Sequence, residues 1–479
     1  MFGDKDVGKM ITLENASFIT KDHIQILDRL TFSIPKGECV VICGPSGSGK
    51  STLFNVLNGL YPELYEGEVL GTWSVLDQVL PVTDFAAYIE RFGVVFQNPK
   101  THFFTTDVIS ELAFIMENFG YPSVEINMRV QQQAAEFFLD PILEASVFAL
   151  SGGQKQQVSI AAATMLAPDL LLLDEPSSNL DFAAIARLKQ ALCQLKARGV
   201  TILIAEHRLA YLLDIADHFF VLENGHLKVA LTRAQIVQLT DAQRIELGLR
   251  ELQASKQSLV HKLGIPSSIT ITLDRISYRY RKQTQVALSI PKLTLTNQEI
   301  IGITGDNGAG KSTFFQVLSG LMRPKKGKIF MNDQVAKEKM RIDACFFVMQ
   351  DVNLQLFFET VRKELLEKAK LPERFDEICT RFNLTALLDR HPHTLSGGEK
   401  QRVVIASAIL SGKTILLFDE PTSGLDYANM MQVSTLLREL ALEGVMVLVI
   451  SHDQEFINQT CHRLLHFEQG QIAADRRME

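Results

Sequence analysis

One short motif occurs twice in this chain and constrains its fold more than any other feature. Each copy reads G-x-x-x-x-G-K-[ST], a pattern in which glycines let successive backbone N–H groups turn inward onto a polyphosphate. An apolar run precedes each copy, at residues 39–43 and 300–304, and a helical pattern of apolar residues follows it. A strand, a loop and a helix in this order place an anion at a helix N-terminus, where free N–H groups and the helix dipole favour it.

The two loops predict residues that bind a nucleoside triphosphate and its magnesium ion. Lys50 and Lys311 would reach the β- and γ-phosphates, and the hydroxyl groups of Ser51 and Ser312 would bind Mg²⁺. One such match arises by chance in roughly a few per cent of chains this long, so two matches in the same context argue against a simple glycine-rich turn. The predicted nucleotide-binding residues are Gly44, Ser46, Gly47, Ser48, Gly49, Lys50, Ser51 and Thr52 in the first loop and Gly305, Asn307, Gly308, Ala309, Gly310, Lys311, Ser312 and Thr313 in the second.

Length and composition indicate two domains in a reducing compartment. The 479 residues exceed one ordinary domain, and 46% hydrophobic residues suffice for two cores. Lys and Arg number 48 against 55 Asp and Glu, so the net charge of -7 argues against a protein held on nucleic acid by its overall charge. The six cysteines form no C-x-x-C pair, and no apolar run or N-terminal segment has the character of a membrane span or a signal peptide. We therefore expect a cytosolic protein unless a partner holds it at a membrane.

Matching residues indicate that the two halves of the chain are copies. The lysines of the two loops lie 261 positions apart, and later matching pairs lie 253 and then 245 positions apart, so the copies differ by short insertions. The sequence predicts a first domain at 1–230, a linker of 38 residues at 231–268 and a second domain at 269–479. The linker is expected to be helical and to pack against a domain through one face that carries Ile245, Leu249 and Leu252.

The first strand of each copy is predicted at 11–18 and 271–278, with the pattern of a strand at the edge of a sheet. Two residues beyond these strands, Thr20 corresponds to Tyr280. The tyrosine ring could stack on adenine, which would give the second copy an aromatic platform that the first copy lacks. The alternative, that Tyr280 is ordinary strand surface, stays open.

Paired acids follow an all-apolar strand in each copy and predict the catalytic centre. Four apolar residues run into Asp174 and Glu175, which places both carboxylates at the carboxyl edge of a sheet, where ligands bind in such folds. The aspartate would hold Mg²⁺, and the glutamate would polarise the attacking water. A glutamine after a second strand would bind Mg²⁺ or that water, and a histidine after a third strand would meet the γ-phosphate. These residues are Gln97, Asp174, Glu175 and His207 in the first copy and Gln350, Asp419, Glu420 and His452 in the second.

A Leu-Ser-Gly-Gly turn opens a further helix in each copy. One serine and two glycines at a helix N-terminus suit an anion. Because each half already has a phosphate loop, we expect this second anion site to bind the nucleotide of the other half. The predicted residues are Ser151, Gly152, Gly153 and Gln154 in the first copy and Ser396, Gly397, Gly398 and Glu399 in the second.

These landmarks, in this order and twice over, resemble the ATP-binding cassette (ABC) ATPases. The resemblance covers nearly the whole chain outside the linker. It implies an α/β fold with two tandem P-loop NTPase domains, each made of a RecA-like core and a helical subdomain. It also implies that the two cassettes pair head-to-tail within one chain on two ATP molecules with Mg²⁺. The differences Thr20/Tyr280, Gln154/Glu399 and Asn179/Gly424 suggest that the two sites are not kinetically equal.

Four short sequence segments resemble those of a narrower group, the fused double ATPases of energy-coupling factor (ECF) importers. These ATPases drive uptake of vitamins, their precursors or transition-metal ions. The segments that carry this resemblance are residues 60–69, 95–99, 178–181 and 206–209. The resemblance implies a transmembrane scaffold (T-type) protein and a small membrane-embedded substrate-binding subunit as partners, no nucleic acid, and a location on the cytoplasmic face of the cell membrane.

The expected docking surfaces for helices of the scaffold are residues 98–106 and 351–359. Family members often have a glutamine five residues after the first glutamine, and here Gln355 matches this pattern whereas His102 departs from it. Two alternatives remain. One is a soluble tandem ABC ATPase that acts on ribosomes or nucleic acid, which usually has a longer charged linker or an extra metal-binding domain. The other is the fused ATPase of a sugar importer, in which one site is typically degenerate.

Overall fold

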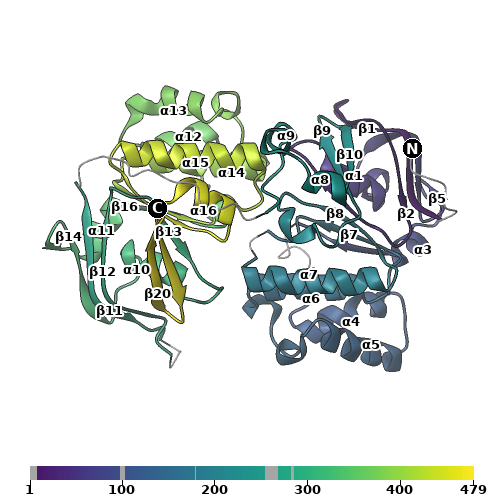
Figure 1. Cartoon of the computed structure of the whole chain (residues 1–479), viewed down its shortest axis with the longest axis horizontal. Helices are drawn as coiled ribbons and strands as arrows, with labels where there is room; N and C mark the ends of the chain where they lie inside the picture. Colours follow the sequence, from purple (N-terminus) through teal and green to yellow (C-terminus); the bar gives the residue numbers. More distant parts are fainter. Residues whose placement is uncertain (1–7, 98–102, 179, 254–267, 282–284, 479) are drawn as a thin grey trace. The chain divides into compact units, whose positions relative to one another are not determined.

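The computed structural model divides the chain into two compact units, residues 1–253 and 254–479 (Figure 1). Each unit contains a four-stranded antiparallel sheet, a six-stranded sheet that is mostly parallel, and a set of helices. The predicted α/β class is therefore confirmed for both halves. The structure describes residues 8–97, 103–178, 180–253, 268–281 and 285–478.

The two sheets of the first unit are built from ten strands. The four-stranded sheet has the order β2 (Gln25–Pro35), β1 (Lys9–Thr20), β4 (Gly67–Val75) and β5 (Gln78–Val79). The six-stranded sheet has the order β10 (His226–Thr232), β9 (His218–Glu223), β3 (Cys39–Cys43), β8 (Thr201–Ala205), β7 (Leu170–Asp174) and β6 (Phe92–Val95). Only β10 runs antiparallel to its neighbour, so the carboxyl ends of the other five strands meet at one edge.

The second unit repeats this arrangement. Its four-stranded sheet has the order β12 (Leu288–Thr296), β11 (Thr270–Tyr278), β14 (Lys326–Met331) and β15 (Gln334–Val335). Its six-stranded sheet has the order β16 (Cys345–Val348), β17 (Ile415–Asp419), β18 (Met446–Ile450), β13 (Ile301–Thr304), β19 (Arg463–Glu468) and β20 (Gln471–Arg477). The same topology in both units agrees with the internal repeat that the sequence predicts.

Among the residues that the structure describes, the first unit contains nine α-helices and the second contains seven. Those of the first unit are α1 (Lys50–Leu57), α2 (Leu60–Glu63), α3 (Phe85–Glu90), α4 (Val108–Asn118), α5 (Ser123–Glu136), α6 (Gly152–Ala163), α7 (Phe182–Ala197), α8 (Arg233–Val237) and α9 (Asp241–Glu246). Those of the second unit are α10 (Lys311–Leu318), α11 (Glu338–Ala344), α12 (Val361–Leu366), α13 (Phe375–Arg381), α14 (Gly397–Leu410), α15 (Tyr427–Leu442) and α16 (Gln454–Thr460). In Figure 1, α4 and α5 lie on the outer side of α6 and α7, away from the sheet.

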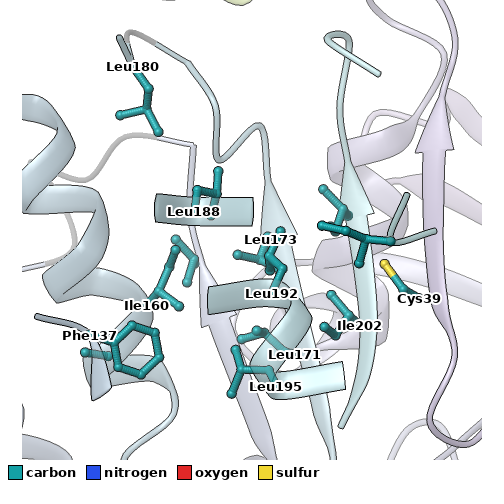
Figure 2. Close-up of a cluster of buried hydrophobic side chains, with 14 of the residues drawn as sticks. Cys39, Phe137, Ile160, Leu171, Leu173, Leu180, Leu188, Leu192, Leu195 and Ile202 are labelled. Atoms are coloured by element: carbon teal, nitrogen blue, oxygen red, sulfur yellow. The ribbon is translucent and has the colours of Figure 1, made fainter. Parts of the chain in front are cut away.

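The apolar run that forms β7 is buried on both faces of its sheet, which explains why it does not alternate with polar residues. Successive side chains of a strand point to opposite faces. Leu171 and Leu173 therefore pack against the helices, and the other two leucines pack between the two sheets of the unit. Figure 2 shows the first of these clusters, where Leu188 and Leu192 of α7 lie beside Leu171 and Leu173. The strand is held between two cores, and its acidic end emerges at the carboxyl edge of the sheet.

The prediction that residues 11–18 and 271–278 form edge strands is wrong. The strand β1 pairs with β2 on one side and with β4 on the other, and β11 pairs with β12 and β14 in the same way. The alternation of apolar and polar residues reports that one face of a strand is exposed. It carries no information about whether the strand's two edges are paired.

The structure also differs from the predicted linker. Residues 231–253 belong to the first unit. The predicted packing against a domain is confirmed for Leu249, which is buried in the core of that unit, and for Leu252, which packs against it. One helical face through residue 252 does not form, because α9 ends at Glu246 and Gly248 adopts a φ of 68° in the left-handed region. Ile245 is exposed at the end of that helix. Residues 254–267 lie outside the described part of the chain.

Candidate functional site

The first glycine of each phosphate loop is required by a close backbone contact. The first loop joins β3 to α1, and a Cβ atom on Gly44 would lie 2.0 Å from the carbonyl oxygen of Leu222. A Cβ atom on Gly305 would lie 2.2 Å from the carbonyl oxygen of Phe467. Both glycines also have a φ near 130°, which other residues rarely adopt. The shape of each loop is therefore set by its neighbours in the fold.

Each loop folds around the ammonium group of its lysine. Lys50 Nζ donates to the carbonyl oxygens of Gly44 and Pro45 at 3.0 and 2.9 Å. Lys311 Nζ makes the equivalent bonds to Gly305 and Asp306. The lysine begins the helix, so its ammonium group lies beside the first N–H groups of α1 or α10. This combination of a cation with a helix N-terminus fits a polyphosphate.

The serine of each loop contacts the aspartate that ends the neighbouring apolar strand. Ser312 Oγ donates to Asp419 Oδ2 at 3.0 Å, and Ser51 hydrogen-bonds to Asp174. Burial raises the pKa of both aspartates, and the serine hydroxyl group and the loop lysine oppose that rise. No cluster of three or more histidine, cysteine or acidic side chains with metal-site geometry occurs within the described ranges. A hydroxyl and a carboxylate oxygen fit Mg²⁺, which usually takes one or two protein ligands together with phosphates and water.

Glu175 lies at the centre of the predicted catalytic group of the first unit. Gln97 Nε2 donates to Glu175 Oε2 at 2.8 Å, and His207 Nε2 lies 3.6 Å from Glu175 Oε1. Burial, together with the charges of Asp174 and Glu206, raises the pKa of Glu175 to about 7. A carboxylate with a pKa near neutrality is suited to accept a proton from a water molecule.

The second unit places its glutamate and histidine in the same relation. His452 Nε2 lies 3.6 Å from Glu420 Oε1, and the His452 backbone N–H donates to Glu420 Oε2 at 3.2 Å. Both glutamates adopt a left-handed backbone, with a φ of 47° at Glu175 and 53° at Glu420. Such a conformation is uncommon for a residue other than glycine and is a mark of functional sites. The glutamate N–H in each unit donates to the carbonyl oxygen of Ala205 or Ile450, which holds it there.

The two glutamines lie just beyond their strands. Gln97 is two residues past the end of β6, and Gln350 is two residues past the end of β16. In the second unit, Gln355 closes the loop that follows, since its side chain accepts from the Met349 N–H at 2.7 Å and donates to the Phe347 carbonyl oxygen at 2.8 Å. Its counterpart, His102, lies outside the described residues, as does Asn179.

The Leu-Ser-Gly-Gly turns form capping boxes at the start of long helices. Ser151 caps α6, and Ser396 caps α14. The side chains of Gln154 and Glu399 reach back to the N–H of their own capping serine at 2.9 and 2.7 Å. The serine and the first glycine are exposed in both turns, so the N–H groups at these helix starts face solvent.

Tyr280 lies next to the second phosphate loop. Its hydroxyl group is 2.9 Å from the hydroxyl group of Thr313, which follows the predicted magnesium ligand Ser312. Its ring packs edge-on against Tyr278 at a centroid distance of 5.1 Å. The side chain is therefore beside the loop, where stacking on adenine stays a prediction.

Comparison with known proteins identifies the family. A family model described as "ABC transporter" matches residues 27–178 and 288–423. A protein of Treponema denticola named "Putative ABC transporter ATP-binding protein" is 39% identical over 97% of this chain and 97% of its own length. The chain belongs to the ABC transporter ATP-binding family. Its membership confirms the resemblance to the ABC ATPases.

Other similar proteins extend over both cassettes of this ABC protein. A Bacillus subtilis protein named "Putative HMP/thiamine import ATP-binding protein YkoD" is 30% identical, over 98% of this chain and 91% of that protein. A solved structure described as "Model of ribosome-bound archaeal Pelota and ABCE1" aligns with a TM-score of 0.72 and 25% identity, over 96% of this chain and 78% of that one. Within the described ranges, no helix of this ABC protein has both the length and the apolar character to cross a bilayer.

Sequence reasoning missed several side chains of this ABC protein that hold its loops. Glu111 and Glu364 are buried and accept N–H groups from the loops after the glutamines, and Glu206 is buried beside His207. A signal was present for all three. Glu111 and Glu364 recur at the 253-residue spacing of the glutamines. Glu206 directly follows four apolar residues of β8, just as Asp174 follows four apolar residues of β7.

Proposed function

We propose that this ABC protein binds and hydrolyses ATP with Mg²⁺ at both phosphate loops and powers an ECF-type importer of a vitamin, a vitamin precursor or a metal ion. Glu175 and Glu420 act as general bases, and His207 and His452 meet the γ-phosphate. Asp174, Asp419, Ser51 and Ser312 hold Mg²⁺, with Gln97 and Gln350 beside it. These ten residues form two matching sets of five, one in each unit, which supports activity at both.

We propose further that the protein docks on the cytoplasmic face of a membrane through the loops after Gln97 and Gln350. The observation that carries this proposal is a pair of exposed aromatic side chains at equivalent positions. Phe104 is 74% exposed and Phe357 is 72% exposed. An exposed aromatic ring at the same place in both copies is typical of an anchor for a partner.

The backbone beneath each ring is held rigidly by a buried carboxylate. Glu111 Oε2 accepts from the N–H groups of Phe104 and Thr105 at 3.0 and 2.9 Å. Glu364 Oε2 accepts from the N–H groups of Phe357 and Phe358 at 2.7 and 3.0 Å. Since a rigid anchor loses less entropy on binding, this arrangement supports a docking function for the two phenylalanines. The occupant that fits is an apolar helix of a membrane scaffold protein.

The test is recovery of membrane partners by the tagged full chain from its native cells in mild detergent. Recovery of a polytopic scaffold, with or without a small membrane subunit, supports the ECF function. We expect the variant Phe104→Ser/Phe357→Ser to lose that recovery, because each serine removes an apolar anchor. The matched control is Ile24→Ser, which changes an apolar side chain that is 57% exposed between β1 and β2.

Two results would overturn the docking proposal. Recovery of ribosomal proteins or nucleic acid without a membrane partner would favour the soluble tandem ATPase, for which the likeness to the ribosome-bound structure is the supporting observation. Equal recovery of the scaffold by the double variant and the control would exclude the phenylalanines as anchors. The substrate would be read from the identity of the small membrane subunit.

A further inference from the structure

A buried carboxylate beside the histidine of the first unit joins two segments of the chain. Glu206 Oε1 accepts from the N–H groups of His207 and Arg208 at 2.8 and 3.1 Å. Glu206 Oε2 accepts from the hydroxyl group of Tyr211 at 3.0 Å and from the N–H of Ser177 at 3.3 Å. Ser177 is the second residue after Glu175, so this carboxylate links the histidine loop to the segment that carries the general base.

The second unit makes the same link from the other side of its histidine. Ser451 corresponds to Glu206, and the buried acid is Asp453, directly after His452. Asp453 Oδ2 accepts from the hydroxyl group of Thr422 at 3.1 Å, and Thr422 is the second residue after Glu420. Asp453 Oδ1 accepts from the Phe456 N–H and caps α16. Both units therefore tie the histidine to the segment after the glutamate, but with different residues.

We propose that Glu206 is the positioning residue that holds His207 against Glu175, and that Asp453 has this role for His452 and Glu420. The inference rests on the proposed ATP hydrolysis and goes beyond it, because neither acid is among the residues proposed to bind ATP or Mg²⁺ or to act as the general base. Glu206 is 2% exposed, so it is out of reach of solvent and acts on the site through the groups that it binds and through its charge.

The geometry explains why a misplaced histidine would affect turnover more than binding. The contact between His207 Nε2 and Glu175 Oε1 is 3.6 Å long, and both side chains are buried. A shift of about 1 Å in such a pair can reduce a rate about 100-fold. Lys50 Nζ donates to the carbonyl oxygens of Gly44 and Pro45, in the loop that we propose binds phosphate, so loss of Glu206 should change affinity for ATP little.

The test is steady-state ATP turnover by the purified full chain. The background variant Glu420→Gln leaves Glu175 as the intact general base, and substitutions are compared within it. We expect Glu206→Gln to lower kcat by about 10–100-fold, because charge-assisted hydrogen bonds to two loops are lost, while KM for ATP stays within about three-fold. Tyr211→Phe removes one donor of the four and should lower kcat by about two- to five-fold.

A rescue separates positioning from general support of the fold. Glu206→Ser should lower kcat as strongly as Glu206→Gln. The triple variant Ser177→Thr/Glu206→Ser/Arg208→Asp introduces the arrangement of the second unit and should return kcat to within about three-fold of the background. The matched experiment in the second unit is Asp453→Asn within a Glu175→Gln background, with the same loss of kcat expected.

Three results would overturn the proposal. They are a kcat of Glu206→Gln within two-fold of the background, a rise in KM as large as the fall in kcat, and a triple variant no more active than Glu206→Ser. Thermal unfolding of each variant identifies any that fails to fold. If Glu206→Gln does not fold, the kcat values of Tyr211→Phe and of the triple variant test the proposal in its place. Absence of turnover in the unmodified chain would instead overturn the proposed ATP hydrolysis itself, and the positioning role with it.

Discussion

Replacing Glu175 by glutamine should stabilise the first unit, and the gain should depend on pH. The substitution keeps the size of the side chain and an oxygen that accepts from Gln97, but it removes a carboxyl group whose pKa burial and nearby acids raise to about 7. The unfolded chain has an ordinary glutamate, with a pKa of 4.5. The folded state therefore binds more protons than the unfolded state between these two values, and folding stability falls as pH rises through that range.

The magnitude follows from the difference between the two pKa values. About 2.5 units at 1.36 kcal/mol each gives about 3 kcal/mol of destabilisation by the ionised carboxylate at pH 8. At pH 5 the folded carboxyl group is protonated, and the cost falls to less than about 1 kcal/mol. Glu175→Gln should thus raise the Tm of the first unit by about 5–10 °C at pH 8 and by much less at pH 5.

The assay is calorimetric unfolding at both pH values, in EDTA and without nucleotide so that no ligand shifts the equilibrium. The control is Glu63→Gln, an exposed position at the end of α2, where a change within about 0.5 kcal/mol is expected at both pH values. An increase in Tm that is the same at pH 5 and pH 8, or no increase at pH 8, would show that Glu175 does not carry a buried charge.

Three further predictions concern other parts of the chain. Gly305→Ala should lower affinity for ATP at least 10-fold in a nucleotide-binding assay, because the added Cβ atom would meet the Phe467 carbonyl oxygen. The Cβ atom of Gly308→Ala would meet no atom within 4 Å, so this variant should lose less affinity. Equal losses of affinity would contradict this reasoning. Leu171→Ala should lower the free energy of unfolding by about 2–5 kcal/mol in a urea titration, since the side chain is fully buried in the cluster of Figure 2. A loss below about 1 kcal/mol would be inconsistent with that packing. Gln355→Ala should reduce recovery of the membrane partner without changing affinity for ATP, because it opens only the loop after Gln350; a parallel loss of both would refute this separation.

Much of the fold and site follows from short patterns whose physical cause is local. A phosphate loop needs glycine at fixed positions, and an apolar run that ends in Asp174 must be a strand with both faces covered. These patterns predict correctly the strand, loop and helix around Lys50 and the position of Glu175. They depend on neighbours in sequence, and neighbours in sequence are visible without a structure.

The remaining features depend on segments that meet only in the folded chain. Glu206 owes its role to Ser177 and Tyr211, and no pattern around residue 206 shows which groups will reach it. The pairing of β1 on both edges depends on β4, which lies far along the sequence. The helix expected through Leu252 stops early because Gly248 reverses the backbone, a local signal that the apolar spacing outweighed in the prediction.

The two capping boxes have the same geometry and opposite electrical character. A helix start carries about half a positive charge. At α6 the neutral Gln154 leaves that charge intact, but at α14 the carboxylate of Glu399 more than cancels it, at a hydrogen-bond distance from Ser396 that is almost the same. A polyphosphate would therefore meet an attractive field at the α6 turn and a weakly repulsive field at the α14 turn. The two turns therefore share their geometry and differ in their charge. Salt should weaken the binding of a polyphosphate at the α6 turn more than at the α14 turn.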